Sequence, residues 1–269
     1  MRSIRLIASD LDGTLLRSDG TVSARTREAI RAAQAGGVRV VFVTARPPRV
    51  VGAIVEAAAL EGVVICSNGA ILYDVARGAI VRHERLAADL AREFGAALRA
   101  LAPDLVFATE HGHQLGYEPH FPRIFDDGVP EHLCRVDHIH ALCDEAITKL
   151  IVHHPEQDAD ALADWIGAHV GERAEVTHSG GPFIEIGAVG VSKASGLRRL
   201  CDDLGLTARQ VMAFGDMPND LPMLRFAGQS VAMANAHPAV RAAASEVTAS
   251  NDEDGVAIRI ERLLDELAT

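Results

Sequence analysis

Short apolar runs alternate with helix-like segments over residues 1–82, and this alternation constrains the fold more than any other feature of the sequence. The expected strands are Ile4–Leu11, Val38–Thr44 and Val63–Cys66, and the expected helices are Ser23–Gln34 and Pro47–Leu60. Because parallel neighbours need a crossover connection, usually a helix, this order indicates βαβ units. We therefore predict an α/β fold with a Rossmann-like core and a parallel sheet.

The same alternation returns near the end of the chain. The elements expected there, helices and strands in turn, are Ser192–Leu204, Val211–Gly215, Pro218–Phe226, Ser230–Met233 and Asp252–Leu267. Strands and helices separated in sequence can complete one sheet when a second domain is inserted between them. We expect residues 1–82 and 188–269 to form that discontinuous core.

The middle of the chain, residues 83–187, has a different pattern and reads as an inserted α+β domain. Helical spacing and shorter strand-like runs are mixed there, in the segments Leu86–Leu101, Leu105–Thr109, Ala146–His153, Asp158–Val170, Glu175–His178 and Phe183–Ile186. This mixture favours an antiparallel sheet with helices on one face. Gly187 and Gly190 stand at the exit and are candidate hinge points.

Composition excludes several classes of protein. The chain has 269 residues, 48% of them hydrophobic and 23% charged, which is an ordinary globular profile rather than a disordered one. Its net charge of −11 argues against nucleic acid or anionic membranes as partners. No apolar run is long enough to span a bilayer or to form a signal peptide, and the four cysteines show no CxxC spacing. We therefore expect a cytoplasmic protein with reduced thiols, either a monomer or a weak homodimer.

Two acids follow the first strand, at the edge where open α/β sheets bind their ligands. Asp10 and Asp12 flank Leu11, and Gly13 gives the backbone freedom to turn sharply. A turn with two solvated acids is one interpretation of this pattern. The other is a nucleophilic carboxylate that also holds Mg²⁺, followed by a carboxyl group that donates and accepts protons.

The ends of the second and third strands carry polar groups that suit phosphate. Thr44, Ala45 and Arg46 precede a helix, so Thr44 is either a helix cap or, with backbone amides, a phosphate-binding hydroxyl. Asn68 follows the third strand, where it is either a turn residue or a substrate contact.

The last two candidates lie after the inserted domain. Lys193 is one of only two lysines and stands in the first turn of a predicted helix, where the helix dipole disfavours a cation. Asp216 and Asp220 follow the fourth strand, where they are either an acidic helix start or a Mg²⁺ ligand and a residue that orients the metal site. Acids at two strand ends, a hydroxyl and a lysine together suit a phosphate dianion and a hard cation.

These residues, in this order, resemble the haloacid dehalogenase-like phosphohydrolase superfamily. The segments that carry the resemblance are Asp10-Leu11-Asp12-Gly13-Thr14, Thr44, Lys193 and Gly215-Asp216-Met217-Pro218-Asn219-Asp220. The insertion between Thr44 and Lys193 resembles the C2B type of cap domain and the Cof-type phosphatases. This resemblance covers the whole core.

The resemblance implies a role for each catalytic residue. Asp10 becomes an aspartyl phosphate, and Asp12 protonates the leaving alcohol and then activates water. Mg²⁺ is held by Asp10, the backbone carbonyl of Asp12 and Asp216, while Asp220 reaches the metal through water or orients Lys193. Lys193 also stabilises negative charge on Asp10 and the transferring group.

The substrate-binding residues follow from the same resemblance, with two departures. The implied set is Thr44, Ala45, Arg46, Asn68, Lys193 and Asn219. Ala45 stands where relatives often have glycine, and Met217 where many have asparagine. Neither change removes a charged group, so we expect the chemistry to be intact.

The inserted domain also holds a histidine and cysteine cluster, His132, Cys134, His138, His140 and Cys143. Its spacing matches no recurrent zinc pattern, so we interpret these as loop or surface residues. His111, His113, His120 and Arg123 are candidates to line a cleft instead.

The function expected from the sequence is a Mg²⁺-dependent phosphatase of small phosphorylated metabolites, such as sugar phosphates. The alternatives are a phosphomutase or phosphotransferase, which passes the phosphoryl group to another alcohol, and a regulator that binds a phosphorylated metabolite without turnover.

Overall fold

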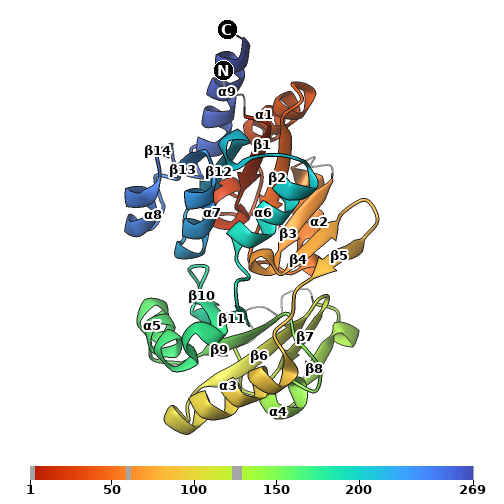
Figure 1. Ribbon diagram of the computed structural model, residues 1–269, viewed down its shortest axis with the longest axis vertical. Coiled ribbons are helices and arrows are strands. Elements are labelled where there is room, and N and C mark those ends of the chain that lie inside the picture. The colour runs from red at the N-terminus through yellow and green to blue at the C-terminus, as the bar shows by residue number, and fades with distance from the viewer. Residues whose placement is uncertain (1–3, 59–61, 123–128, 269) are drawn as a thin grey trace. The chain divides into compact units, whose positions relative to one another are not determined.

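The computed structural model describes residues 4–58, 62–122 and 129–268. The chain forms two compact units, each with its own sheet (Figure 1). The core unit comprises Met1–Arg46, Val50–Val81 and Ser192–Thr269, and the cap unit comprises Pro47–Arg49 and Arg82–Val191. The chain therefore returns from the cap unit to the core unit between Val191 and Ser192, just before Lys193.

The sheet of the core unit is mixed rather than wholly parallel. Its described strands are β1 (Leu6–Ser9), β2 (Arg39–Val43), β3 (Val63–Cys66), β4 (Ile71–Asp74), β5 (Ala79–His83), β12 (Val211–Gly215), β13 (Gln229–Ala232) and β14 (Glu246–Val247). Their order is β14-β13-β12-β1-β2-β3-β4-β5. Pairing is parallel from β14 to β3, whereas β4 runs antiparallel to β3. The α/β, Rossmann-like expectation is confirmed, but the strands β4 and β5 are missing from the sequence prediction.

Strand order reverses direction at β1, and this fixes where the site lies. The chain proceeds from β1 to β2 and β3 on one side, and later places β12 on the other side of β1. The carboxyl ends of β1 and β12 therefore meet at a switch point, where open α/β sheets bind ligands. Asp10 follows β1 directly, and Asp216 follows β12 directly.

Helices cover the core sheet, whose central strands β1 and β12 are buried along their whole length. The helix α1 packs against α9, and α6 packs against α7, the pair in front of the sheet in Figure 1. Ser23 begins α1 because its side chain accepts a hydrogen bond from the backbone of Thr26. The core helices are α1 (Ala24–Ala35), α2 (Pro48–Ala57), α6 (Lys193–Asp203), α7 (Leu221–Phe226), α8 (Pro238–Ala243) and α9 (Gly255–Ala268).

The cap unit is an α+β domain with a second sheet. Its strands are β6 (Val106–His111), β7 (Gln114–Tyr117), β8 (Cys134–Val136), β9 (Lys149–His153), β10 (Ala174–Thr177) and β11 (Phe183–Ala188), in the order β10-β11-β9-β6-β7-β8. The described pairings are antiparallel except β7 with β8. Its helices are α3 (Ala88–Leu101), α4 (Ile139–Leu142) and α5 (Ala159–Val170).

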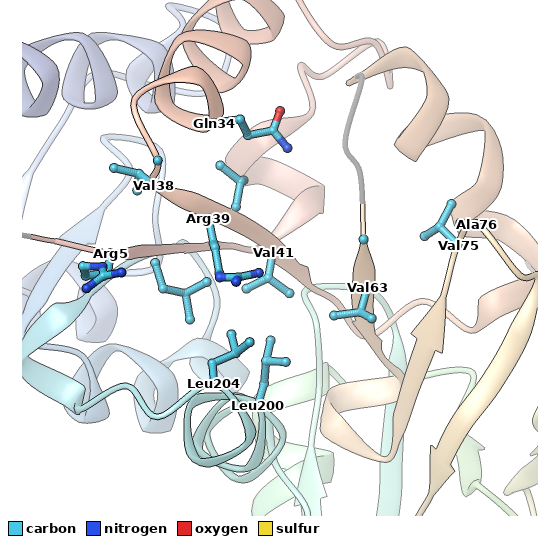
Figure 2. Close-up of a pocket in the computed structure, with 14 residues that line it drawn as sticks. Arg5, Gln34, Val38, Arg39, Val41, Val63, Val75, Ala76, Leu200 and Leu204 are labelled. Carbon is cyan, nitrogen blue, oxygen red and sulfur yellow. The ribbon is translucent and has the colours of Figure 1, made fainter.

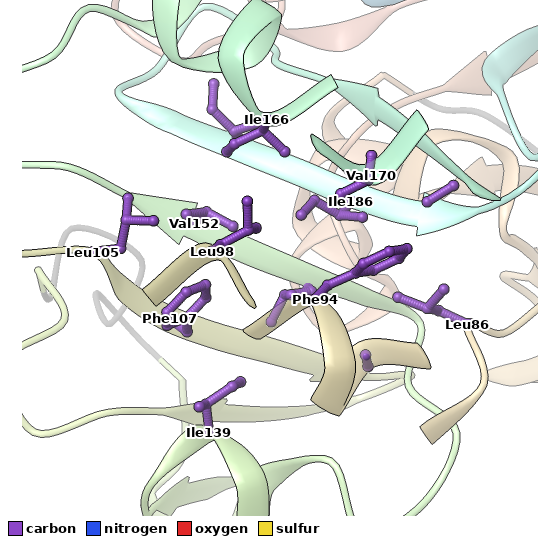
Figure 3. Close-up of a cluster of buried hydrophobic side chains, with 14 of the residues drawn as sticks. Leu86, Phe94, Leu98, Leu105, Phe107, Ile139, Val152, Ile166, Val170 and Ile186 are labelled. Atoms are coloured by element: carbon purple, nitrogen blue, oxygen red, sulfur yellow. The ribbon is translucent and has the colours of Figure 1, made fainter. Parts of the chain in front are cut away.

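Alternation along the cap strands separates a helix-covered face from the opposite face. Phe107, Val152 and Ile186 point toward the helices and join the apolar cluster that also holds Phe94 and Ile166 (Figure 3). This placement follows from the two-residue period of a strand. The opposite face holds a smaller cluster, made of Ala108, Phe121, Ile151 and Phe183.

A pocket of about 1000 Å³ opens in the core unit, at the end of the sheet away from Asp10. Arg39 and Val63 begin β2 and β3, and both line this pocket together with Leu200 of α6 and Leu204, which follows that helix (Figure 2). Because parallel strands share one direction, these residues lie at the amino ends of the strands, whereas Asp10 lies at a carboxyl end. The pocket is therefore separate from the candidate active site.

Candidate active site

The loop after β1 wraps tightly against the end of β12. The backbone N–H of Asp10 donates to the carbonyl of Phe214 at 3.1 Å. Gly13 adopts a φ of 72°, and a Cβ built on it would lie 2.3 Å from Oδ2 of Asp216. Only glycine fits that conformation and that space without strain. The turn predicted at Gly13 therefore has a physical reason, which is the close approach of Asp216.

Three carboxylates converge at this switch point. Asp10, Asp216 and Asp220 each offer an oxygen, and these oxygens lie within 4.8 Å of one another. All three residues are buried. Among the described residues, this is the group of acidic, histidine or cysteine side chains that could hold a metal ion.

Lys193 is the cation inside this cluster. Its Nζ donates to Oδ1 of Asp10 and to Oδ1 of Asp220, both at 2.7 Å. Its side chain is 1% exposed. Although burial by itself disfavours the ammonium ion, the carboxylates of Asp10 and Asp220 raise the pKa of Lys193 above its ordinary value. Lys193 is therefore a fixed positive charge beside Asp10.

Asp220 is fully occupied by hydrogen bonds within the protein. Its Oδ2 accepts from the backbone N–H groups of Asp216, at 2.9 Å, and Met217, at 3.0 Å, while Oδ1 accepts from Lys193. A carboxylate that accepts hydrogen bonds on both oxygens holds Lys193 and the backbone of Asp216 in place. This arrangement favours Asp220 as an orienting group over a direct metal ligand.

The environment of Asp10 and Asp216 fits a divalent cation. Burial raises the pKa of both carboxyl groups, that of Asp216 to about 6, and Asp220 raises both further. Thr14 donates to Oδ1 of Asp216 at 2.8 Å. Three carboxylates and one ammonium leave two negative charges, and oxygen ligands with that net charge suit Mg²⁺.

Asp12 lies apart from the three carboxylates and contacts Arg46. The Arg46 Nε donates to Oδ2 of Asp12 at 2.7 Å, and its Nη2 donates to Oδ1 at 2.6 Å. Both side chains are about half exposed. The side chain of Asp12 therefore does not join the metal cluster, and only its backbone carbonyl remains as the ligand that the resemblance implies.

Thr44 combines the two interpretations considered for it. Its buried Oγ1 accepts the backbone N–H of Arg46 at 3.0 Å, in the manner of a turn or helix cap. A hydroxyl that accepts one hydrogen bond retains its own proton to donate. Ala45 lies between them in the sequence, and the Arg46 guanidinium extends from this segment to Asp12.

Asn68 and Asn219 meet although 151 residues separate them. The Nδ2 of Asn219 donates to Oδ1 of Asn68 at 3.1 Å, and both residues are buried. The Oδ1 of Asn219 is buried without a hydrogen-bond partner among the described residues. Asn68 has a φ of 53°, which asparagine tolerates in a turn. The structure brings these two predicted residues together.

Close packing of backbone positions Lys193. The helix α6 lies against the turn at Ser67–Gly69, where a Cβ on Gly69 would lie 2.0 Å from the carbonyl oxygen of Ser192. The same helix begins with a capping box between Ser192 and Ser195. The predicted cap at Ser192 is therefore present, and Lys193 is the first residue of the helix.

Two contacts in the site were absent from the sequence prediction. Thr14, quoted only as part of a motif, holds Asp216, and Asn235 donates to the carbonyl of Gly13 at 2.8 Å. A hydroxyl four residues after Asp10 gives a weak signal for the first. Nothing in the sequence marks Asn235, because its role depends on a loop 222 residues away.

The predicted histidine and cysteine cluster of the cap unit does not lie wholly in loops or at the surface, because Cys143 is fully buried in the apolar cluster of the cap and Cys134 begins the strand β8. His138 caps α4 by accepting from the backbone N–H of His140, and burial raises the pKa of the Cys143 thiol to about 11. His111 bonds to Thr109 through Nε2 at 3.0 Å. Arg123, proposed as a cleft residue, lies outside the described residues.

In the described part of the chain, the helices are too short or too polar to cross a membrane.

A buried aspartate at the end of a central strand, a lysine held against it and a second acidic strand end define a phosphoryl-transfer hydrolase of the α/β class. Comparison with known proteins gives the family. A family model described as haloacid dehalogenase-like hydrolase matches residues 7–260, so the chain belongs to that family.

Relatives and solved structures agree with this assignment. The chain is 31% identical over 265 residues to 5-amino-6-(5-phospho-D-ribitylamino)uracil phosphatase YitU of Bacillus subtilis, covering 94% of each chain. It matches the structure of SMU.1108c from Streptococcus mutans with a TM-score of 0.84 at 25% identity, over 98% of this chain and 100% of that one.

The sugar phosphatase BT4131, described as subclass IIB, shares the fold with a TM-score of 0.82 at 22% identity, over 96% of this chain and 98% of that one. The protein is thus a phosphatase of the haloacid dehalogenase-like hydrolase family, with a fold that includes an inserted cap domain.

Proposed function

We propose that this phosphatase hydrolyses small phosphomonoesters, such as sugar phosphates, through an aspartyl phosphate on Asp10. The observation that carries this proposal is the contact of Lys193 with Asp10 and Asp220, beside Asp216. These residues are distant in sequence and buried together, which is costly unless the charges serve one another or a ligand.

In the first step, a carboxylate oxygen of Asp10 attacks the phosphorus of the bound ester. The new oxygen–phosphorus bond forms as the ester bond to the leaving oxygen breaks, and a proton from the Asp12 carboxyl completes the leaving alcohol. Lys193 stabilises the charge that develops around the transferring group. Thr44, Ala45, Arg46, Asn68 and Asn219 bind or surround the substrate.

In the second step, water attacks the phosphorus of the aspartyl phosphate and gives its proton to Asp12. The bond between Asp10 and phosphorus breaks, inorganic phosphate leaves and both aspartates return to their starting states. Bound Mg²⁺ would be held by Asp10, Asp216 and the backbone carbonyl of Asp12, with Asp220 orienting the site, and would neutralise the charge of the phosphoryl group.

The test of the nucleophile is Asp10→Asn. An amide cannot attack phosphorus, and it removes a buried charge, so the variant should fold and lose nearly all phosphate release. We would measure inorganic phosphate with and without Mg²⁺, and with excess EDTA, and follow folding by circular dichroism. Substantial release by a folded Asp10→Asn protein would reject the assignment, and full activity in EDTA would reject the metal.

The substrate class needs a panel rather than a single ester. Relatives are named for the phosphatase step on 5-amino-6-(5-phospho-D-ribitylamino)uracil, and a fold neighbour is titled a sugar phosphatase. We would therefore compare sugar phosphates, polyol phosphates, that phosphorylated ribitylaminouracil, nucleotides and pyrophosphate. Release of phosphate without an added acceptor would distinguish hydrolysis from a phosphomutase or phosphotransferase reaction, and binding without release would indicate a regulator.

We further propose that the enzyme acts in the cytoplasm as a monomer or weak homodimer. Cys143 and Cys201 are reduced thiols, as a reducing compartment favours. Gel filtration with light scattering over a range of concentrations tests the oligomeric state.

A further inference from the structure

The contact between Arg46 and Asp12 is the feature of the core unit that the proposed mechanism leaves unused. Two parallel hydrogen bonds, 2.6 and 2.7 Å long, join the guanidinium to both carboxyl oxygens. The backbone of Arg46 is also fixed, because its N–H donates to Thr44 and its carbonyl accepts from Ser67 at 3.0 Å. The guanidinium therefore reaches Asp12 from a rigid base.

Stability does not explain this pair. The two side chains are 38% and 46% exposed, and ion pairs with that exposure contribute little to folding. A planar guanidinium that engages both oxygens, however, fixes the orientation of a carboxyl group far better than a single contact does. The effect of Arg46 is therefore on the direction in which Asp12 points.

The same contact conflicts with the task of Asp12. A proton donor must turn one oxygen toward the leaving group, and in this structure both oxygens accept from Arg46. A phosphoryl dianion is the acceptor that competes best for a guanidinium, since it offers the same two-point geometry with more charge. Substrate binding can thus free one oxygen of Asp12 while Arg46 retains the other.

We propose that Arg46 is a positioning residue for Asp12. It holds the Asp12 carboxyl in the free enzyme and passes one N–H group to a phosphoryl oxygen when substrate binds, so that the released oxygen faces the leaving oxygen. Arg46 transfers no proton; the proton on the leaving alcohol comes from Asp12. This inference rests on the proposed function, because it requires Asp12 to be the acid.

The test uses two esters that differ in their need for a proton. An aryl phosphate such as p-nitrophenyl phosphate expels a stable phenolate, whereas an alkyl phosphate, glycerol 3-phosphate, expels an alkoxide that must be protonated. We would measure kcat/KM, which reports only the steps through cleavage of the ester bond and not the later hydrolysis of the aspartyl phosphate. A residue that only binds phosphate affects both esters equally.

The variants are Arg46→Met and Arg46→Lys, with Arg77→Met as the matched control because Arg77 also pairs with an aspartate, Asp74, at an exposed position. Arg46→Met should lower kcat/KM for the alkyl ester about tenfold or more beyond its effect on the aryl ester, a modest part of what general acid catalysis supplies. Arg46→Lys keeps the positive charge but cannot make two parallel hydrogen bonds to one carboxylate. It should therefore restore kcat/KM for the aryl ester more than for the alkyl ester.

Asp12→Asn links the effect to the acid. It should show the same selective loss, and Arg46→Met added to it should lower the alkyl-to-aryl ratio no further. Equal losses on both esters, or a further fall of that ratio in the double variant, would overturn the positioning role. Failure of the proposed function is distinguishable, because the unmodified enzyme would then release phosphate from neither ester.

Discussion

At the scale of single residues, the site depends on balancing buried charges. Asp10 and Asp220 are buried carboxylates that share one ammonium group, that of Lys193. Burying a charge is costly, and removing its partner leaves that cost uncompensated. The residues to which the proposed function assigns the chemistry are therefore also expected to contribute strongly to local stability.

Lys193→Met should destabilise the protein as well as inactivate it. The substitution keeps an apolar side chain of similar length but leaves Asp10 and Asp220 without their cation, at an expected cost of about 3–5 kcal/mol in the free energy of unfolding. Urea denaturation measures this. The double variant Asp10→Asn with Lys193→Met should recover part of the loss, because one buried charge is gone. Unchanged stability of Lys193→Met would contradict this balance.

Asp216 gives a prediction about pH. Its pKa is raised to about 6, mainly by burial, whereas an unfolded aspartate titrates near 3.8. Without metal, the folded protein then binds this proton more tightly than the unfolded chain does. Protonation of Asp216 therefore stabilises the folded state below about pH 4, and this stabilisation is lost as pH rises through 6. Asp216→Asn should therefore be more stable than the parent at pH 7 in EDTA, by up to about 3 kcal/mol.

The difference in stability between parent and Asp216→Asn should shrink between pH 7 and pH 4. Taking the difference between the two proteins cancels the contributions that other titrating groups make to stability. His83 and His111, whose pKa values burial lowers, are such groups. At pH 7, Mg²⁺ should stabilise the parent and have little effect on Asp216→Asn. A difference that does not change with pH would contradict the raised pKa of Asp216.

At the scale of elements, the site depends on how closely α6 approaches the turn after β3. A Cβ on Gly196 would lie 2.8 Å from Cγ2 of Ile65 and 2.9 Å from the Cα of Gly69. The backbone atom cannot yield as a flexible side chain can. Because Lys193 is three residues earlier on the same helix, any displacement of α6 also moves its ammonium group.

Gly196→Ala should therefore lower both stability and turnover. We expect about 1–3 kcal/mol of destabilisation from overpacking, and a fall in kcat as Lys193 shifts from Asp10. Gly167→Ala in α5 is the matched control, since its Cβ would meet nothing within 4 Å. That control should be neutral or stabilise by about 0.5–1 kcal/mol. Thermal unfolding and phosphate release measure both variants, and equal behaviour would contradict the packing argument.

At the scale of the whole molecule, the chain has two units with separate apolar cores. The buried side chains of the cap cluster come from elements between Leu86 and Ile186, and the core strands β1 and β12 are buried in the other unit. Stability is then expected to be local to each unit, so that a defect in one opens that unit first. The net charge of the whole chain does not describe the site: the chain carries −11 overall, yet the proposed reaction needs the cation of Lys193 beside the phosphoryl group.

Leu150→Ala tests this independence. Leu150 is fully buried in the cap cluster, and its truncation should cost about 2–5 kcal/mol. Hydrogen exchange followed by mass spectrometry should show faster exchange in peptides from residues 86–186, with β1 and β12 still protected. Equal loss of protection in both units would show that they unfold as one.

The sequence predicted the core elements well and the additional strands poorly. Strand ends carrying Asp10, Asn68 and Asp216 could be located because buried parallel strands are continuous apolar runs bounded by polar turns. The strands β4 and β5 were missed since they are mostly half-buried rather than continuous apolar runs, and β7 and β8 are too short to show a period. Short elements acquire their structure from neighbours rather than from their own pattern.

By itself, the sequence determined the α/β class, the inserted domain and the identity of the acids, lysine and hydroxyl, because periodicity and strand-end chemistry are local properties. Only the tertiary structure decided how they combine. It placed Asp216 and Lys193 beside Asp10, turned Asp220 toward the backbone, and paired Asp12 with Arg46. Those choices depend on distances between residues far apart in the chain, which packing sets and no local pattern records.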